Sequence, residues 1–193
     1  MNNLTEIKSY FRDIKMSFLM SKYDITINDS SLNDKFHFLK KNRKLIKYAN
    51  SIGAVLTGSR AISSYIINGK SMLDRKPNDW DFIITKQMAF DICDKFDIEF
   101  NLIDKVINVD SQWISWYPGY STVPNRLGIQ DVQLIIEDEL PSFIQGEKYK
   151  IADFNYIIGH KIESIEIGKN KSKHKYDLNK IIVKLNSKIY ENT

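Results

Sequence analysis

The sequence predicts a mixed α/β (α+β) fold, in which a short mixed β-sheet is flanked by helices and preceded by a helical extension. Apolar residues recur at helical spacing near the start of the chain, and two short apolar runs, 54–57 and 78–85, are typical of buried strands. The chain has 193 residues, 42% of them hydrophobic, which is enough for one substantial core. We therefore expect an N-terminal helical extension (residues 1–53) packed on a main domain with C-terminal helices (residues 54–193).

Two amphipathic patterns predict the helical extension. The first helix is indicated by apolar residues at helical spacing, Leu4, Ile7, Phe11, Ile14 and Phe18. A turn is expected at residues 28–30, after which Ser31 and Asp34 are typical of a helix start. Gly53 is expected to end this second helix and to deliver the chain to the first strand.

The main domain is expected to combine short strands with longer helices. Strands are predicted at residues 54–57, 78–85 and 127–137, and helices directly after Gly58, at 87–96, at 154–167 and near the C-terminus. Residues 98–109 are ambiguous between helix and strand. Residues 110–126 contain Pro118, Gly119 and Pro124, which predict a long irregular connection of the kind that often carries function.

Two carboxylates in the second expected strand form the first candidate site. Asp79 and Asp81 alternate with Trp80 and Phe82, so both carboxylates should point to one face of the strand. Two carboxylates on one face repel each other unless a cation neutralises them. A hard divalent cation such as Mg²⁺ does this with oxygen ligands and keeps positions for water and phosphate oxygens.

A small turn, Gly58-Ser59-Arg60, precedes the two carboxylates. Gly58 permits close approach of the backbone. Ser59 and Arg60 stand at an expected helix start, where free N–H groups favour a triphosphate. Together, the turn and the carboxylates predict a site that holds a nucleotide by its phosphates.

Gly58-Ser59 followed by Asp79-x-Asp81 resembles the DNA polymerase β-like nucleotidyltransferase superfamily. The spacing is more similar to the branch that contains the abortive-infection type nucleotidyltransferase toxins than to the minimal members. The resemblance implies a nucleotidyltransferase-like fold and an enzyme that moves a nucleoside monophosphate from a nucleoside triphosphate to an acceptor hydroxyl, with release of pyrophosphate. It also implies Mg²⁺ or Mn²⁺ as cofactor, held by the carboxylates, and nucleotide contacts from the turn, Arg60 included.

The resemblance also shows where the chain departs from the family. Pro77 stands in place of a usual serine, and Arg60 in place of a usual threonine. Members normally have a third carboxylate on a neighbouring strand, and we assign this metal-binding and catalytic role to Asp131. Gln133 on the same face and Glu137 near the strand end are weaker candidates. If Gln133 occupies the family position, the site lacks one ligand, and catalysis by two metals becomes doubtful.

In the C-terminal part, family members often carry a lysine on one helix and a Lys-His-x-x-Asp-Leu element that opens the next. The matching residues here are Lys161 and the run Lys173-His174-Lys175-Tyr176-Asp177-Leu178. The resemblance implies that Lys161 contacts the nucleotide phosphates as a compact charge. It also places Lys173, His174 and Asp177 around the nucleotide, with the last two bracing the wall of the site.

Charge and composition bear on partners and compartment. The net charge is +4, and lysines gather within residues 35–47 and 169–175. Basic clusters on both sides of a nucleotide site slightly favour an RNA acceptor such as tRNA; a solvated surface balanced by acids is an equal alternative. The single Cys93 allows no internal disulfide, and no apolar run is long enough to span a bilayer. We expect a cytoplasmic protein without a membrane partner.

Two other functions stay open. One is a non-catalytic nucleotide- or RNA-binding protein that keeps the fold, and the other is a toxin-like regulator controlled by an antitoxin-like protein partner. The acceptor, the preferred nucleoside triphosphate and the oligomeric state do not follow from the sequence.

Overall fold

A six-stranded mixed sheet forms the centre of the computed structural model, which describes residues 3–12, 20, 24–33, 40–96, 112–115, 132–168 and 171–191. The strand order is β6-β7-β5-β2-β9-β8. These strands are β2 (Val55–Thr57), β5 (Trp80–Thr85), β6 (Gln112–Ser115), β7 (Val132–Glu137), β8 (Phe143–Gln145) and β9 (Lys150–Ala152). The pairs β5–β7 and β2–β9 are parallel, whereas β2–β5, β6–β7 and β8–β9 are antiparallel. The predicted mixed α/β architecture is confirmed at this level.

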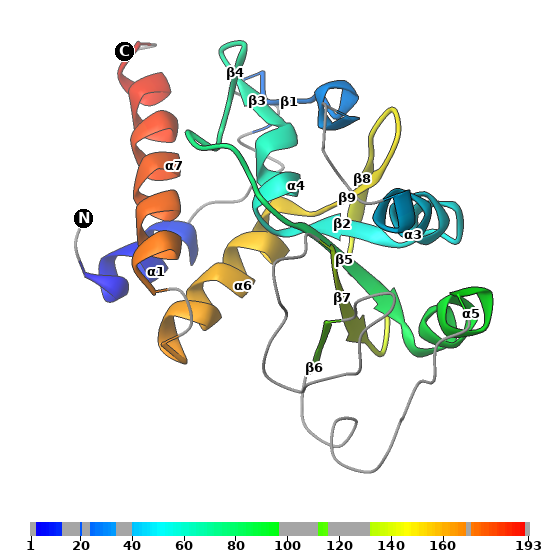
Figure 1. The fold of residues 1–193 in the computed structure, drawn as a ribbon. Helices are drawn as coiled ribbons and strands as arrows, with labels where there is room; N and C mark the ends of the chain where they lie inside the picture. Colours follow the sequence, from blue (N-terminus) through cyan, green and yellow to red (C-terminus); the bar gives the residue numbers. More distant parts are fainter. Residues whose placement is uncertain are drawn as a thin grey trace.

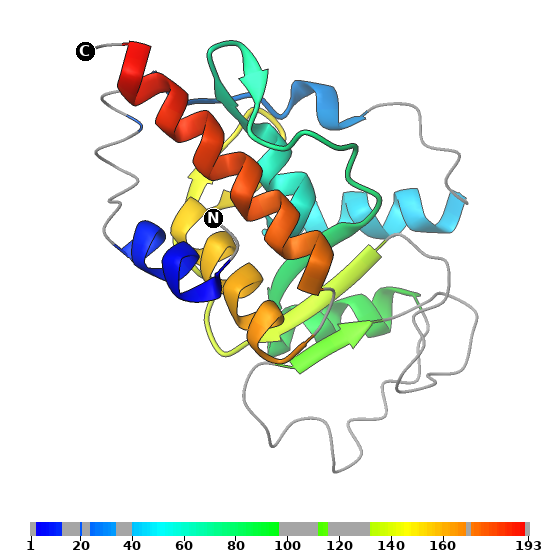
Figure 2. The ribbon, with the colours of Figure 1, turned by 90° about the vertical axis from the view of Figure 1, so that its left-hand side faces the viewer.

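Helices cover both faces of the sheet (Figure 1). The helices are α1 (Leu4–Arg12), α3 (Lys40–Ser51), α4 (Gly58–Ser64), α5 (Lys86–Phe96), α6 (Phe154–Glu166) and α7 (Lys171–Glu191). Helices α3 and α5 lie on one face, and α1, α6 and α7 lie on the other, as both views show (Figures 1 and 2). None of the helices within the described ranges is both long and apolar enough to cross a membrane.

A second, three-stranded sheet sits beside the first and is not among the predicted elements. It consists of β1 (Thr26–Ile27), β3 (Tyr65–Ile67) and β4 (Lys70–Ser71), in the order β1-β3-β4. Asn68 and Gly69 connect β3 to β4 with φ values of 53° and 69°. Two successive positive φ angles are typical of the tight turn that closes a two-residue hairpin. A short 3-10 helix, η1 (Ser30–Asn33), follows β1 where a turn at residues 28–30 is expected.

Most predicted elements are found with small changes at their ends. The strands expected at 54–57 and 78–85 are β2 and β5, and the helix expected at 154–167 is α6. The expectation of an irregular connection over residues 110–126 is wrong for the part that the structure describes, because residues 112–115 form strand β6. These residues form a strand because they pair with β7, a partner distant in the sequence that local patterns do not indicate. The ambiguous residues 98–109 lie outside the described residues.

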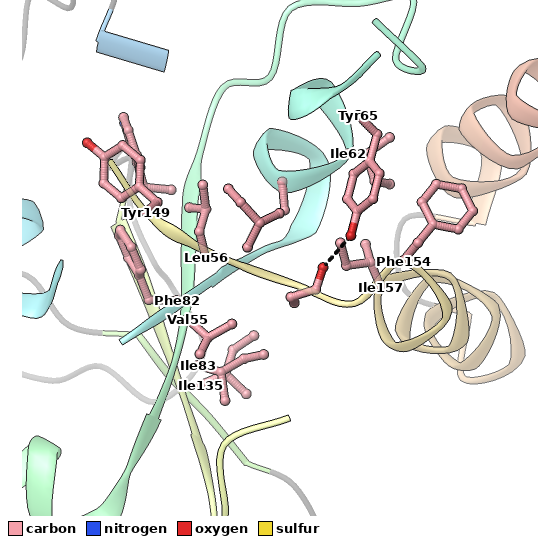
Figure 3. Packing of buried hydrophobic residues seen from close by; sticks show 14 of the residues in the cluster. Val55, Leu56, Ile62, Tyr65, Phe82, Ile83, Ile135, Tyr149, Phe154 and Ile157 are labelled. Atoms are coloured by element: carbon pink, nitrogen blue, oxygen red, sulfur yellow. Dashed lines mark hydrogen bonds between the residues drawn. The ribbon is translucent and has the colours of Figure 1, made fainter. Parts of the chain in front are cut away.

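The buried core joins the helical extension to the sheet. Ile7 of α1 and Leu45 of α3 are fully buried in the same cluster as Phe82 of β5. Figure 3 shows how side chains from different parts of the chain meet, with the hydroxyl of Tyr65 donating a hydrogen bond of 2.9 Å to the carbonyl of Ala152. The described parts of the extension therefore share one core with the main domain, while the boundary at residue 53 stays a prediction.

A buried carboxylate also ties the extension to the β8–β9 connection. Asp29 is 1% exposed and accepts hydrogen bonds from the backbone N–H groups of Glu147, Lys148 and Tyr149, at 3.1, 2.9 and 2.8 Å. Charged acceptors of backbone N–H groups make strong hydrogen bonds. The link holds strand β9, and through it β2, in place beside the candidate site.

Candidate active site

One pocket gathers most of the predicted site residues. It lies between the sheet and helices α4, α6 and α7 and opens to solvent. Seven predicted residues line it: Gly58, Ser59, Asp79, Asp81, Lys161, Lys173 and His174. The elements that carry them are far apart in the chain, so the pocket is a product of the fold.

The carboxylate pair lies where strand β5 meets β2. Asp81 is in register with Thr57 on β2 and with Gln133 on β7, so two neighbouring strands fix its backbone. Gly58 follows Thr57 and turns away with a φ of +67°. A Cβ atom on Gly58 would lie 2.0 Å from Oδ2 of Asp81. Glycine is therefore required here for two reasons, its backbone conformation and the closeness of the Asp81 carboxylate.

Burial and the neighbouring charge of Asp79 raise the pKa of Asp81 to about 7, against the opposing charges of Lys161, Lys173 and Arg60. The protein alone thus leaves the ionised pair under-compensated. A hard divalent cation would supply the missing charge, and two adjacent carboxylates are suitable oxygen ligands for it. The chemistry of the donor set therefore fits one Mg²⁺ or Mn²⁺ ion held by Asp79 and Asp81.

The third carboxylate is not found within the described residues. Asp131 lies outside them, and its assignment stays a prediction. The position in register with Asp81 belongs to Gln133, whose neutral side chain lines the pocket. Glu137 is four residues further along β7, about 13 Å away at the usual rise per residue, where it accepts a hydrogen bond of 3.0 Å from Tyr156. No cluster of three potential ligands is present in the described ranges.

A buried ionic network holds Lys161, which lines the pocket. Asp177 of α7 has a fully buried side chain. It accepts two hydrogen bonds from Arg75, from Nε at 2.8 Å and Nη2 at 2.7 Å, and one from Nζ of Lys161 at 2.9 Å. Burial alone would raise the pKa of Asp177, but the hydrogen bonds from Arg75 and the charge of Lys161 outweigh it, so the pKa is lowered. The network of two cations and one carboxylate carries a net positive charge, which favours an anionic ligand.

Lys161 connects this network to Ser59 and His174. Burial lowers its pKa, and the ion pair with Asp177 opposes that shift. Its Nζ lies 3.3 Å from Oγ of Ser59 and 3.3 Å from Nδ1 of His174. An ammonium group has only donors, so Nδ1 must be the acceptor and the neutral ring carries its hydrogen on Nε2. Burial and the charge of Lys161 lower the pKa of His174 to about 4, which keeps the ring neutral at pH 7.

Ser59 and Lys173 offer further donors to the pocket. Oγ of Ser59 accepts from Nη2 of Arg75 at 2.7 Å as well as from Lys161, so its own hydrogen is available to a ligand. Lys173 lines the pocket and makes no hydrogen bond or ion pair within the described part of the chain. Lysine and serine donors at one wall are suitable for phosphate oxygens.

Arg60 and Asp177, although predicted to contact nucleotide, do not line the pocket. Arg60 is 3% exposed, and its guanidinium donates to the backbone carbonyls of Asp79, Pro77 and Asn78. The expectation of a phosphate contact from Arg60 is therefore corrected. Asp177 lies behind Lys161 and braces it, as the resemblance implied for this residue.

Several pocket residues are not among the sequence-based candidates. Ile157, His160 and Ser164 share the face of α6 that carries Lys161, and the spacing of three and four residues was an available signal. Ile135 of β7 lies two residues past Gln133. From the sequence alone, Arg75 could pair with Asp74 or Asp79 or contact a substrate; in the structure it pairs with Asp177 and Ser59 in place of the two aspartates, and substrate contact stays a prediction.

The lysine clusters do not both border the site. The cluster within residues 35–47 lies on α3 where it is described, on the face of the sheet opposite to α6 and α7 (Figures 1 and 2). Of the second cluster, Lys173 lines the pocket, whereas the expectation of a basic cluster on the other side of the site is wrong for the described lysines of α3 (Figure 1). Lys171 is exposed there, and Lys175 is half-buried.

No family model matches this chain, and comparison with curated proteins and with solved structures gave no match either.

Proposed function

We propose that this protein is a metal-dependent nucleotidyltransferase with a nucleotidyltransferase-like fold. The observation that carries the proposal is the lining of one pocket, which combines a carboxylate pair with cationic and hydroxyl donors. Asp81 stands on strand β5 and Asp79 directly before it, and Ser59, Lys161 and Lys173 line the same pocket. This combination suits a nucleoside triphosphate with a divalent cation.

The chain's own residues act mainly by orientation and charge. Lys161 and Lys173 attract the phosphates, while Ser59 Oγ and His174 Nε2 donate hydrogen bonds to their oxygens. A divalent cation bound to the carboxylates would neutralise phosphate charge and lower the pKa of the attacking hydroxyl. The hydroxyl oxygen would form a bond to the α-phosphorus while the bond from the α-phosphorus to the oxygen that bridges it to the β-phosphate breaks, so that pyrophosphate leaves and the hydroxyl proton passes to solvent water. Fixed charges and donors of this kind lower the barrier without reorganisation during reaction.

The other end of the pocket is suited to the nucleoside. Ile135 and Ile157 supply apolar contacts, and His160 supplies a ring. His160 is held beside the ring of Tyr156, with a centroid distance of 5.2 Å. Pockets for small ligands commonly combine apolar walls with a few placed polar groups.

An RNA 3′ hydroxyl, as in tRNA, is our preferred acceptor. The support is the lysines at the start of α7, where Lys173 lines the pocket and its neighbours Lys171 and Lys175 would contact phosphates of a bound strand. A protein hydroxyl and a small molecule are the other acceptors to be tested.

The test is transfer of label from each of the four nucleoside triphosphates to total cellular RNA with Mg²⁺ or Mn²⁺. Asp79→Asn and Asp81→Asn should abolish transfer and keep the fold. Asp94→Asn, an exposed carboxylate on α5 at the opposite face, is the matched control and should remain active. Full activity of either site variant would refute the proposal, and label on protein or a small molecule would change the acceptor.

A non-catalytic nucleotide-binding function is the second candidate, because Gln133 rather than a carboxylate stands in register with Asp81. It requires nucleoside triphosphates or RNA to bind equally well with and without Mg²⁺, and binding to survive Asp81→Ala. A tenfold gain of affinity on adding Mg²⁺, lost in Asp81→Ala, would exclude it. Control by an antitoxin-like partner stays a prediction, tested by toxicity on expression that Asp79→Ala relieves.

A further inference from the structure

The two candidate metal ligands are fixed in different ways. Asp81 belongs to strand β5 and has ladder partners on both sides, Thr57 and Gln133. Asp79 lies one residue before β5, which begins at Trp80. The residues that lead to it, 72–79, form neither helix nor strand. The sheet therefore aligns one carboxylate, and something else must align the other.

The side chain of Arg60 supplies that alignment. Its Nε donates to the carbonyl of Asp79 at 3.1 Å, and its Nη2 donates to the carbonyls of Pro77 at 3.2 Å and, more weakly, Asn78 at 3.5 Å. Three consecutive carbonyls of an irregular segment are thus bound by one guanidinium. The planar fork of arginine suits such a task, because its donors are rigidly spaced.

Arg60 acts from the face opposite to the carboxylates. Its Cζ lies 4.4 Å from the centre of the Trp80 ring, and Trp80 points away from Asp79 and Asp81 because side chains alternate along the strand. Arg60 belongs to helix α4, two residues after Gly58, and only 3% of its surface is exposed to solvent. It is therefore rigidly mounted and separated by the strand itself from any ligand in the pocket.

We propose that Arg60 is a positioning residue that holds the backbone of residues 77–79 so that Asp79 faces the pocket beside Asp81 and completes the cation site. The inference rests on the proposed function only in that the carboxylates bind a divalent cation. Arg60 and Lys173 thus have different roles: Arg60 aligns Asp79, whereas Lys173 contacts the triphosphate and takes no part in that alignment.

The test compares cation binding with nucleotide binding in folded protein. Mn²⁺ affinity is measured by electron paramagnetic resonance without nucleotide, and nucleoside triphosphate affinity is measured in EDTA. Arg60→Lys keeps the charge but loses the fork, and Arg60→Met keeps the length. Both should weaken Mn²⁺ binding about tenfold or more, the usual effect of removing a group that orients a metal ligand. Metal-free nucleotide affinity should stay within about twofold, whereas Lys173→Met should show the reverse pattern.

A stability control separates positioning from general damage. Tyr65→Phe removes the buried hydrogen bond to Ala152 and should lower the melting temperature without changing Mn²⁺ affinity. Mn²⁺ affinity unchanged in the Arg60 variants, with wild-type protein binding Mn²⁺, would overturn the positioning role alone. A wild-type protein that binds no Mn²⁺ would overturn the cation site and the positioning role together.

Hydrogen exchange of the unmodified protein provides a readout that needs no substitution at a buried site. If Arg60 orders the segment before a cation arrives, its own Nε–H, which donates to the carbonyl of Asp79, should exchange slowly with solvent in metal-free protein. Protection that appears only after Mn²⁺ is added would overturn the inference, even if the Arg60 variants failed to fold.

Discussion

Replacing Gly58 with alanine tests the geometry of the candidate site most directly. Gly58 has a φ of +67°, and a Cβ atom there would lie 2.0, 2.9 and 3.1 Å from Oδ2, Cγ and Cβ of Asp81. Rotation of the Asp81 side chain relieves the first two contacts but not the third, because Cβ is fixed by the backbone of β5. The substitution therefore moves the carboxylate and presses two central strands apart.

The loss of stability caused by Gly58→Ala has two parts, which a matched control separates. Gly69 has a φ of +69°, and no heavy atom lies within 4 Å of the position that a Cβ atom would take there, so Gly69→Ala reports backbone strain alone. That strain is about 1–2 kcal/mol for a non-glycine residue. Overpacking adds about 1–3 kcal/mol. Gly58→Ala should thus destabilise the protein by about 1–3 kcal/mol more than Gly69→Ala, as measured by urea denaturation.

A double-mutant cycle assigns the excess to Asp81. In an Asp81→Ala background, Oδ2 and Cγ are gone and only the contact of 3.1 Å with Cβ remains, so the excess of Gly58→Ala over Gly69→Ala should shrink without vanishing. Gly58→Ala should also weaken Mn²⁺ binding at least about tenfold, because the carboxylate is displaced. Equal destabilisation by Gly58→Ala and Gly69→Ala, together with unchanged Mn²⁺ affinity, would refute the reasoning.

Three further outcomes follow from the charges around the pocket. Asp177→Asn should lower the free energy of unfolding by about 3 kcal/mol, because it leaves Lys161 and Arg75 without their carboxylate; a loss below about 1 kcal/mol in urea denaturation would contradict the network. The folded pKa of His174, about 4 against 6.5 when unfolded, makes its contribution to stability fall as pH drops from 6.5 to 4. The pKa of Asp81 is about 7 in the folded protein and 3.8 in the unfolded chain, so its contribution to stability rises as pH falls through this range. Relative to the unmodified protein, His174→Gln should therefore be more stable at pH 5 than at pH 7, and Asp81→Asn should be less stable at pH 5 than at pH 7. Parallel stability profiles for the two variants would argue against both pKa shifts. Mn²⁺ affinity should decrease about tenfold per pH unit below 7, because protons compete for Asp81; a pH-independent affinity in Mn²⁺ titrations would place the cation elsewhere.

Features that depend on neighbouring residues were predictable from the sequence. The alternation of Asp79, Trp80 and Asp81 fixes which side chains share a face, and the glycine before them indicates a tight turn at the strand end. The hairpin β3–β4 was equally accessible, because Asn68-Gly69 between short apolar or polar runs is a strong hairpin signal. Its absence from the predicted elements is an error of interpretation, since the local information is present.

Features that depend on strand register and on residues distant in the sequence could not be predicted from the sequence. The sequence shows that Gln133 and Asp131 share a face, but only the β5–β7 ladder shows that Gln133 is opposite Asp81. Arg75 and Asp177 are 102 positions apart, and nothing local pairs them. Arg60 illustrates the same limit: its place in the turn predicted a phosphate contact, whereas its direction was decided by the carbonyls and the Trp80 ring on the other side of β5.

The distance along the chain between the carboxylates and Asp177 has a consequence for synthesis. A ribosome makes Gly58, Asp79 and Asp81 long before Asp177, and Lys161 cannot be neutralised until α7 exists. A nascent or prematurely released chain that ends before α7 would therefore hold Asp79, Asp81, Ser59 and Lys161 but lack Lys173, His174 and Asp177. If the proposed function holds, a partial translation product without α7 should bind nucleoside triphosphates more weakly than the whole chain.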